Sequence, residues 1–136
     1  MPARFTAYDT VWIDRLTTLV RQLRATGAGV LVLGPIPDPQ SRVPECLSIH
    51  LDDATACSPE KSVAVNQTGI AAEAAAVDVA GGQYTDITDL FCAADRCPVI
   101  VGNTMVYFDR NHISLEYSQL MAPAIGPLAD RAVSAR

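Results

Sequence analysis

The chain has 136 residues, of which 49% are hydrophobic and 18% are charged, a balance typical of one globular domain. Ten Lys and Arg against fifteen Asp and Glu give a formal net charge of −5, and no basic cluster occurs, so nucleic-acid binding is not expected. No apolar run approaches the roughly 20 residues of a membrane-spanning helix. Residues 1–8 lack the apolar stretch of a signal peptide.

The first predicted element is a helix over residues 10–26, because apolar residues recur there on one helical face: Trp12, Leu16, Leu19, Val20 and Leu23. A continuous apolar run over residues 30–33, bounded by glycines, is typical of a buried parallel strand. Four prolines between residues 35 and 44 then predict an extended, non-helical loop that continues to residue 58.

The second predicted helix begins at Ser58-Pro59, a strong start signal, and runs through the Ala-rich residues 60–79 to Gly81-Gly82. A short strand is expected over residues 83–87. Strands that alternate with helices predict an α/β layered fold with a parallel sheet. Only two convincing strands are available, whereas sheets usually have about four to six. The chain is therefore expected to be the C-terminal portion of an α/β domain.

The last third of the chain holds two short apolar runs, 99–101 and 105–108, which are separated by a turn around Asn103. A final helix is predicted from Ser114, and its two prolines, Pro123 and Pro127, are expected to kink or restart it. The three aromatic residues Tyr84, Tyr107 and Phe108 are predicted to lie in the core, because the chain has few aromatic residues.

Four cysteines occur in two close pairs: Cys46, Cys57, Cys92 and Cys97. Neither pair has C-x-x-C spacing, and neither histidine stands in a zinc-type spacing with them, so we expect no metal and no cofactor. Two small disulfide loops are the favoured interpretation, and they imply an oxidising compartment. The alternative is that the four cysteines are free thiols in the cytoplasm. The lack of a signal-peptide pattern in residues 1–8 agrees with this alternative.

Two further local patterns are interpreted as structural. His50 lies near Asp52 and Asp53, but three ligands in one loop without a fourth make a weak metal site, and a solvated loop is favoured. Asn66-Gln67-Thr68 matches a glycosylation sequon within the second predicted helix, and such a short pattern is frequent by chance.

The candidate catalytic residues are Asp109 and His112, three positions apart in a polar turn just before the last helix. At this spacing the acid can accept a hydrogen bond from one imidazole nitrogen, while the other nitrogen faces outward as a general base for a hydroxyl nucleophile. A D-x-x-H pattern is common by chance, and His112 could simply cap the helix. The spacing alone therefore favours an ordinary turn.

Its context strengthens the catalytic interpretation, because the block from Tyr107 to Ser114 resembles the last catalytic block of SGNH (GDSL-type) hydrolases. The chain from Trp12 onward resembles the end of the SGNH domain fused to membrane acyltransferase-3 proteins of mycobacteria and related actinobacteria. The matching segments are residues 30–39, 46–57, 86–92, 97–103 and 107–112. The resemblance from Trp12 to the C-terminus covers about nine-tenths of the chain, and the combination of segments is more specific than any one of them.

The resemblance implies a partial flavodoxin-like three-layer sandwich with a short parallel sheet. It also implies a serine nucleophile in a G-D-S block, with Asp109 as the acid and His112 as the base. Only Asp109 and His112 can be assigned here, since no G-D-S occurs and Asn103 stands at the wrong place for the family's asparagine. We therefore expect a single domain over residues 1–136 that is truncated at its N-terminus and has little activity alone.

The implied activity is that of an acyl-ester hydrolase or O-acyltransferase acting on acyl groups of a cell-envelope glycan or glycolipid. The partners would be this acylated saccharide or lipid and the acyltransferase-3 membrane domain of a longer parent protein, at the extracytoplasmic face of the envelope. The exported setting supports the pairing of Cys46 with Cys57 and of Cys92 with Cys97. The alternative function is a non-catalytic binding or assembly module. An exposed sheet edge would favour a homodimer.

Overall fold

The computed structural model describes residues 7–134, which fall into two compact units. The first, here the loop unit, comprises residues 36–65 and 88–122. The second, here the sheet unit, comprises residues up to 35, residues 66–87 and residues from 123 onward. The last helix, α5 (Leu115–Ser134), contributes its first part to the loop unit and its second part to the sheet unit.

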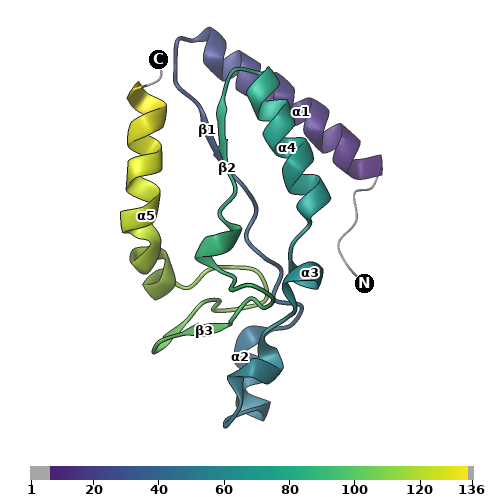
Figure 1. Ribbon diagram of the computed structural model, residues 1–136, viewed down its shortest axis with the longest axis vertical. Coiled ribbons are helices and arrows are strands. Elements are labelled where there is room, and N and C mark those ends of the chain that lie inside the picture. Colours follow the sequence, from purple (N-terminus) through teal and green to yellow (C-terminus); the bar gives the residue numbers. More distant parts are fainter. Residues whose placement is uncertain (1–6, 135–136) are drawn as a thin grey trace. The chain divides into compact units, whose positions relative to one another are not determined.

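The sheet unit is built around two parallel strands, β1 (Leu31–Leu33) and β2 (Gln83–Thr85), in the register Leu31 to Gln83. Two helices, α1 (Ala7–Ala25) and α4 (Gln67–Val79), run side by side on one side of the strands. The second part of α5 lies on the other side (Figure 1). Helix, sheet and helix form the three layers of the predicted α/β sandwich.

Side chains of alternate β1 residues face opposite layers, as in any strand. Val30 and Val32 pack with Tyr84 against a buried cluster from the helical side: Leu16, Val20, Val77 and Ala80. A Cβ at Gly82 would lie 2.9 Å from the side chains of Val20 and Val77, so the tight approach of strand and helices requires glycine there. The predicted first helix is confirmed, although only part of its apolar stripe is buried.

The exposed part of that stripe corrects the sequence-based expectation for α1. Trp12, Leu19 and Leu23 are all exposed, whereas Leu16 and Val20 are buried. Helix α4 packs against α1, and this contact buries Leu16 and Val20 but leaves the rest of the apolar stripe uncovered. The indole of Trp12 instead donates a 2.6 Å hydrogen bond to Glu73, which also accepts one from the Tyr84 hydroxyl at 2.7 Å.

The second predicted helix is two helices, α3 (Lys61–Ala64) and α4, which corrects the single helix expected over residues 60–79. The break falls at Val65, whose backbone is extended, and at Asn66, whose side chain accepts a 3.0 Å hydrogen bond from the Gly69 N–H. Asn66 thus caps α4, and a strong N-cap starts a new helix within a helical sequence. Ser58 does not cap, because its hydroxyl donates to the Ala54 carbonyl.

The proline-rich loop also differs from the prediction, since it contains α2 (Val43–Ile49) and a 3₁₀ turn, η1 (Ala54–Cys57). Pro44 stands in the first turn of α2, where the missing N–H costs nothing, so this proline begins a helix and does not prevent one. Asp53 accepts a hydrogen bond from the Thr55 N–H and caps η1, which gives this carboxylate a structural role.

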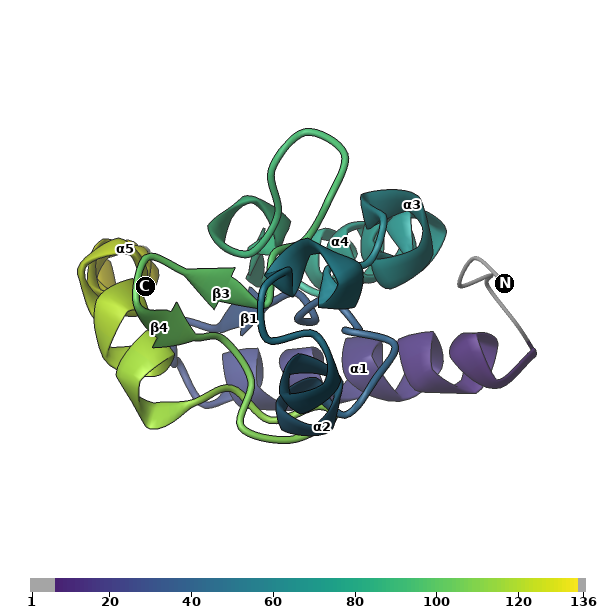
Figure 2. The same ribbon diagram turned by 90° about the horizontal axis from the view of Figure 1, so that it is seen from below.

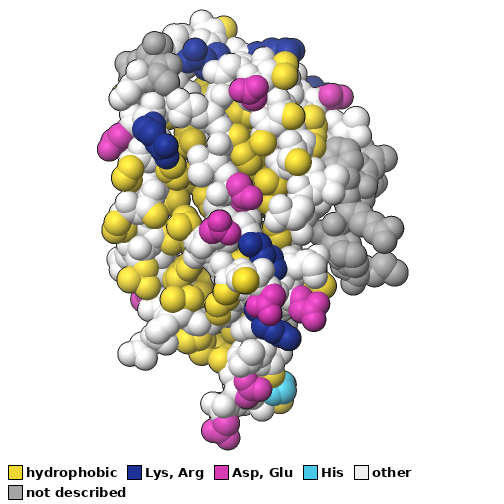
Figure 3. Space-filling view, viewed as in Figure 1, with side chains coloured by type: hydrophobic (Ala, Val, Ile, Leu, Met, Phe, Trp, Pro, Cys, Tyr) yellow, Lys and Arg dark blue, Asp and Glu magenta, His cyan; other side chains and the backbone are white. Residues whose placement is uncertain are grey.

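Helix α5 continues through Pro123 and Pro127, so the helix does not restart there, which corrects that part of the expectation. The two prolines are four residues apart, so they lie on one helical face, and the carbonyl that Pro127 leaves without a donor belongs to Pro123. Figure 3 shows apolar side chains along α5, where Leu120 and Val133 are exposed. Within residues 7–134 no helix is both long and apolar enough to cross a membrane.

The loop unit has a small core of its own. A hairpin of β3 (Ile100–Val101) and β4 (Thr104–Met105) turns at Gly102 and Asn103, as predicted (Figure 2). After η2 (Thr88–Leu90), Phe91 meets Tyr117 of α5 with ring centroids 5.5 Å apart. Further residues fully buried in this unit are Val43, Val99, Val106 and Tyr107. This core supports the turn that carries Asp109 and His112.

Candidate active site

The turn between Tyr107 and Ile113 is closed by a backbone bridge between these two residues. The Phe108 N–H donates to the His112 carbonyl at 3.1 Å, so residues 108–112 form a short loop with fixed ends. Inside the loop, Asp109 Oδ1 accepts hydrogen bonds from the N–H groups of Asn111 at 2.8 Å and His112 at 2.7 Å. An aspartate that binds its own following backbone in this way is a strong turn former.

The second carboxylate oxygen contacts the imidazole: Asp109 Oδ2 lies 2.7 Å from His112 Nδ1. With Nδ1–H donating to a carboxylate, the neutral ring carries its lone pair on Nε2, the nitrogen that can act as a base. The His112 side chain is 65% exposed and that of Asp109 39% exposed. No described residue hydrogen-bonds Nε2, so this nitrogen is open to a reacting hydroxyl. The structure thus forms the predicted contact, and the catalytic role stays a prediction.

The electrostatics keep Asp109 ionised. The backbone N–H of Asn111, then the His112 side chain and then the His112 N–H lower the pKa of Asp109 from 3.8 to about 2. Hydrogen bonds to the charged form stabilise the carboxylate over the acid. A carboxylate that stays negative at every physiological pH can orient the imidazole and stabilise its protonated form.

Both ends of the turn are held by buried groups. Tyr107 is 1% exposed, its hydroxyl donates to the Pro37 carbonyl at 3.0 Å, and burial raises its pKa. Ser114 Oγ donates to the Met105 carbonyl at 2.5 Å and accepts from the Tyr117 N–H at 3.1 Å. Ser114, and not His112, therefore caps the start of α5.

The predicted disulfides Cys46–Cys57 and Cys92–Cys97 are both present. The first joins α2 to η1. Val43, the first residue of α2, donates its N–H to the Asp109 carbonyl at 3.3 Å. Helix α2, which the first disulfide anchors, therefore contacts the backbone of the candidate catalytic turn through its first residue.

Phe108 corrects the expectation that all three aromatic residues lie in the core. Its side chain is 56% exposed and stacks on the His112 ring with centroids 5.6 Å apart and planes 23° apart. Tyr84 and Tyr107 do pack inward, Tyr84 in part. Neighbouring residues in an extended segment point to opposite faces, so burial of Tyr107 sends Phe108 outward. The sequence could therefore have predicted an exposed Phe108 next to His112, because adjacent residues of an extended segment alternate between the buried and the exposed face.

A nucleophile is missing from the described site. None of the seven serines stands in a G-D-S context: Ser41, Ser48, Ser58, Ser62, Ser114, Ser118 and Ser134. Within residues 7–134 no serine hydroxyl hydrogen-bonds to His112, and the same residues contain no group of three or more potential ligands placed to hold a metal ion. The described residues thus contain the contact between Asp109 and His112 but no serine against it.

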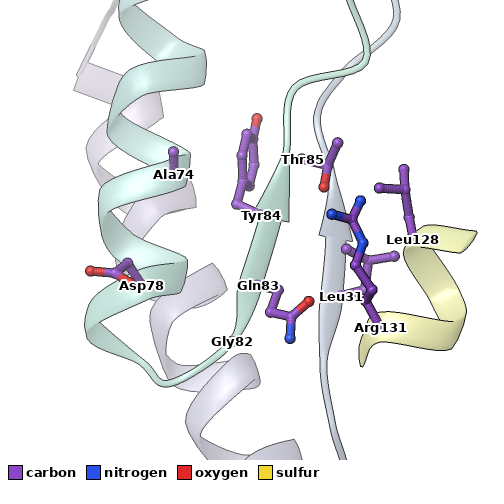
Figure 4. Close-up of a pocket in the computed structure, with 9 residues that line it drawn as sticks. All are labelled: Leu31, Ala74, Asp78, Gly82, Gln83, Tyr84, Thr85, Leu128 and Arg131. Carbon is purple, nitrogen blue, oxygen red and sulfur yellow. The ribbon is translucent and has the colours of Figure 1, made fainter. Parts of the chain in front are cut away.

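A separate cavity of about 410 Å³ lies in the sheet unit, over β2 and between α4 and α5 (Figure 4). Tyr84, Thr85 and Gln83 line it from the strand, and Arg131 reaches into it from α5. Its lining contains no histidine, cysteine or serine. The cavity therefore has no histidine base beside the hydroxyl groups of Tyr84 and Thr85.

An α/β sandwich that ends in an Asp-x-x-His turn before its last helix has the features of the SGNH class of hydrolases. The sequence matches the family described as "SGNH domain (fused to AT3 domains)" over residues 2–127, and the chain belongs to this family. The predicted family resemblance is confirmed. No curated protein matches the chain in sequence.

The fold is similar to a solved structure, the periplasmic domain of a lipopolysaccharide acetyltransferase from Salmonella ser. Paratyphi A. The TM-score is 0.70 at 18% sequence identity, and the match covers 89% of this chain and 50% of the other. The chain therefore spans about half the length of that domain. At this identity the likeness confirms the predicted fold class.

Proposed function

We propose that this chain carries the acid–base half of an SGNH acyl-transfer site, with His112 as the general base and acid and Asp109 as its orienting carboxylate. The observation that carries the proposal is the 2.7 Å contact between His112 Nδ1 and Asp109 Oδ2, which leaves an exposed Nε2 free to take a proton. Family membership supports the same assignment, because the two residues stand in the D-x-x-H block.

The nucleophile in this proposal is a serine from polypeptide outside residues 1–136. Its oxygen attacks the acyl carbon while His112 Nε2 takes its proton, and the same proton then passes to the departing alcohol. In the second half, His112 Nε2 takes a proton from an acceptor hydroxyl or from water, whose oxygen attacks the acyl carbon of the acyl-serine. The bond from the acyl carbon to the serine oxygen then breaks, and the same proton passes from His112 to that serine oxygen. We propose accordingly that residues 1–136 are one SGNH domain without its first part.

The proposed substrate is an acyl ester, acetyl in the first place, on a cell-envelope glycan or glycolipid. The proposed location is the extracytoplasmic face, beside an acyltransferase-3 membrane domain of a longer parent protein. The family description names that fusion, and the similar solved structure is titled a periplasmic domain of an acetyltransferase. Two disulfides suit an oxidising compartment.

A second candidate is a non-catalytic binding or assembly module. The observation in its favour is that the described residues hold no serine hydroxyl against His112. The two candidates differ in one measurable property, because only the enzyme forms an acyl-serine.

The test compares the 136-residue chain alone with the same chain combined with a G-D-S polypeptide, which is to be sought in the reading frame upstream of it, using a fluorophosphonate label and p-nitrophenyl acetate. The chain alone should give neither serine labelling nor hydrolysis above its His112→Ala variant. The combination should label one serine and hydrolyse the ester, and His112→Ala should abolish both. A combination that stays inert would support the binding-module alternative, whereas serine labelling that is insensitive to His112→Ala would remove His112 from the mechanism.

A further inference from the structure

The loop unit contains a cavity of about 530 Å³ directly beside the Asp–His pair. Its lining residues come from the start of α2 and from the catalytic turn: Arg42, Pro44, Glu45, Phe108, Asp109, Arg110 and Asn111. Cavities of roughly 300–1,000 Å³ are typical of sites for small organic ligands. The volume is thus sufficient for a sugar ring with its substituents.

The chemistry of this lining is one exposed aromatic face surrounded by polar groups. Phe108 is 56% exposed, although a phenyl ring gains by burial, and its ring lines the cavity and stacks on His112. Arg42 pairs with Glu45 at 3.2 Å, and Asp109 pairs with His112. Arg110 makes no ion pair with any residue that the structure describes. Its guanidinium and the Asn111 amide are donors available to a ligand.

We propose that this cavity is a sugar-binding subsite, in which Phe108 stacks on the C–H face of a pyranose ring and Arg110 and Asn111 hydrogen-bond its hydroxyl groups. The negative face of an aromatic ring attracts polarised C–H groups, and the surrounding donors match a ring of hydroxyls. The inference rests on the proposed function and narrows it. Of the saccharide and lipid substrates, the subsite selects the saccharide and makes Phe108 a specificity-determining residue.

The lining argues against a fatty acyl chain as the occupant. Pro44 and Phe108 are its only apolar residues, while five of the seven are charged or carry an amide. Burying a long alkyl chain against such groups would desolvate them without partners, at a cost in free energy. A sugar replaces the lost water with hydrogen bonds of its own.

The experiment measures binding of methyl α-D-pyranosides to the 136-residue chain by saturation-transfer difference NMR, with methyl octanoate as the acyl probe. Binding needs no nucleophile, so its result is independent of the labelling test above. Phe108→Leu is expected to weaken pyranoside binding about three- to tenfold, the range measured for aromatic pairs, and Phe108→Tyr is expected to retain it. Trp12→Leu is the matched control, because Trp12 is 57% exposed and lies in the sheet unit.

The proposal predicts that saturation transfer is strongest for protons on one ring face and disappears selectively in Phe108→Leu. Three results would overturn the proposal. The first is that Phe108→Leu binds pyranosides as well as the wild type does, and the second is that Trp12→Leu loses as much pyranoside binding as Phe108→Leu does. The third is that the chain binds methyl octanoate but no pyranoside. A chain that binds pyranosides through Phe108 but never supports acyl-serine formation would retain the subsite and refute the proposed catalysis.

Discussion

His112 donates to Asp109 twice, once from its backbone N–H to Oδ1 and once from its ring to Oδ2, both at 2.7 Å. One carboxylate therefore fixes the position of the histidine in the turn and the orientation of its imidazole. The two tasks use different oxygens, so they can be separated by substitution.

The substitution Asp109→Asn separates the positioning of His112 in the turn from the orientation of its imidazole. The amide oxygen can still accept the two backbone N–H groups, but the amide nitrogen cannot accept from Nδ1–H, so the ring proton should move to Nε2. We expect the ¹⁵N shifts of the ring to report this change of tautomer in the isolated chain. In the assembled enzyme the rate should fall about 10³- to 10⁴-fold, as in serine triads. An unchanged tautomer would contradict the assigned role of Asp109.

The Asp109 carboxyl should titrate near pH 2, because its pKa is lowered from 3.8 to about 2. A lowered pKa in the folded state contributes stability that is present above about pH 4 and is lost as the pH falls through about 2. Carbonyl ¹³C NMR measures the midpoint. In His112→Ala the pKa should rise but stay below 3.8, because the Asn111 N–H is the larger cause. A midpoint at or above 3.8 in the wild type would contradict the turn geometry.

Replacing both Cys46 and Cys57 by serine should lower the free energy of unfolding by about 2–3 kcal/mol, the chain-entropy value for a closed loop of this size. Denaturant unfolding measures the loss. Hydrogen exchange of the Val43 amide should accelerate as well, since this amide donates to the Asp109 carbonyl. The Cys92→Ser/Cys97→Ser pair is the control and should leave Val43 protected. Unfolding that is unaffected by reductant would count against both bonds.

Asn66→Ala should destabilise the chain by about 1 kcal/mol, because it removes the acceptor that caps α4. Asn66→Asp keeps a side-chain oxygen at the helix start and should retain most of the stability. Thermal or denaturant unfolding of the three proteins measures this difference. Equal losses in both variants would show that the amide group, and not the cap, matters.

Self-association is expected through β1, because among the described residues its pairing partner is β2 alone. An open strand edge with apolar neighbours such as Leu33 tends to recruit another strand. Light scattering at micromolar concentration should detect dimers, and Leu33→Lys should shift them to monomers. A monodisperse wild-type monomer that melts cooperatively at high temperature would refute both the dimer and the proposed truncation.

The sequence alone was sufficient for features that depend on residues close together in the chain. Asp109 and His112 are three positions apart, and the two cysteine pairs are five and eleven positions apart, so local backbone geometry brings each set together. The first strand followed from its apolar run, although β1 is only half-buried and Leu33 is exposed, whereas β2 consists of Gln83, Tyr84 and Thr85 and has no such run. Family membership followed from the order of these short blocks.

Only the tertiary structure decided what surrounds the pair. Tyr107 bonds to Pro37 across 70 positions, and Val43 reaches Asp109 from a helix that four prolines had seemed to exclude. The side that Phe108 faces depends on which neighbour the core buries. These features arise from contacts between distant segments, whose free energy outweighs local propensity, and spacing within the sequence does not encode them.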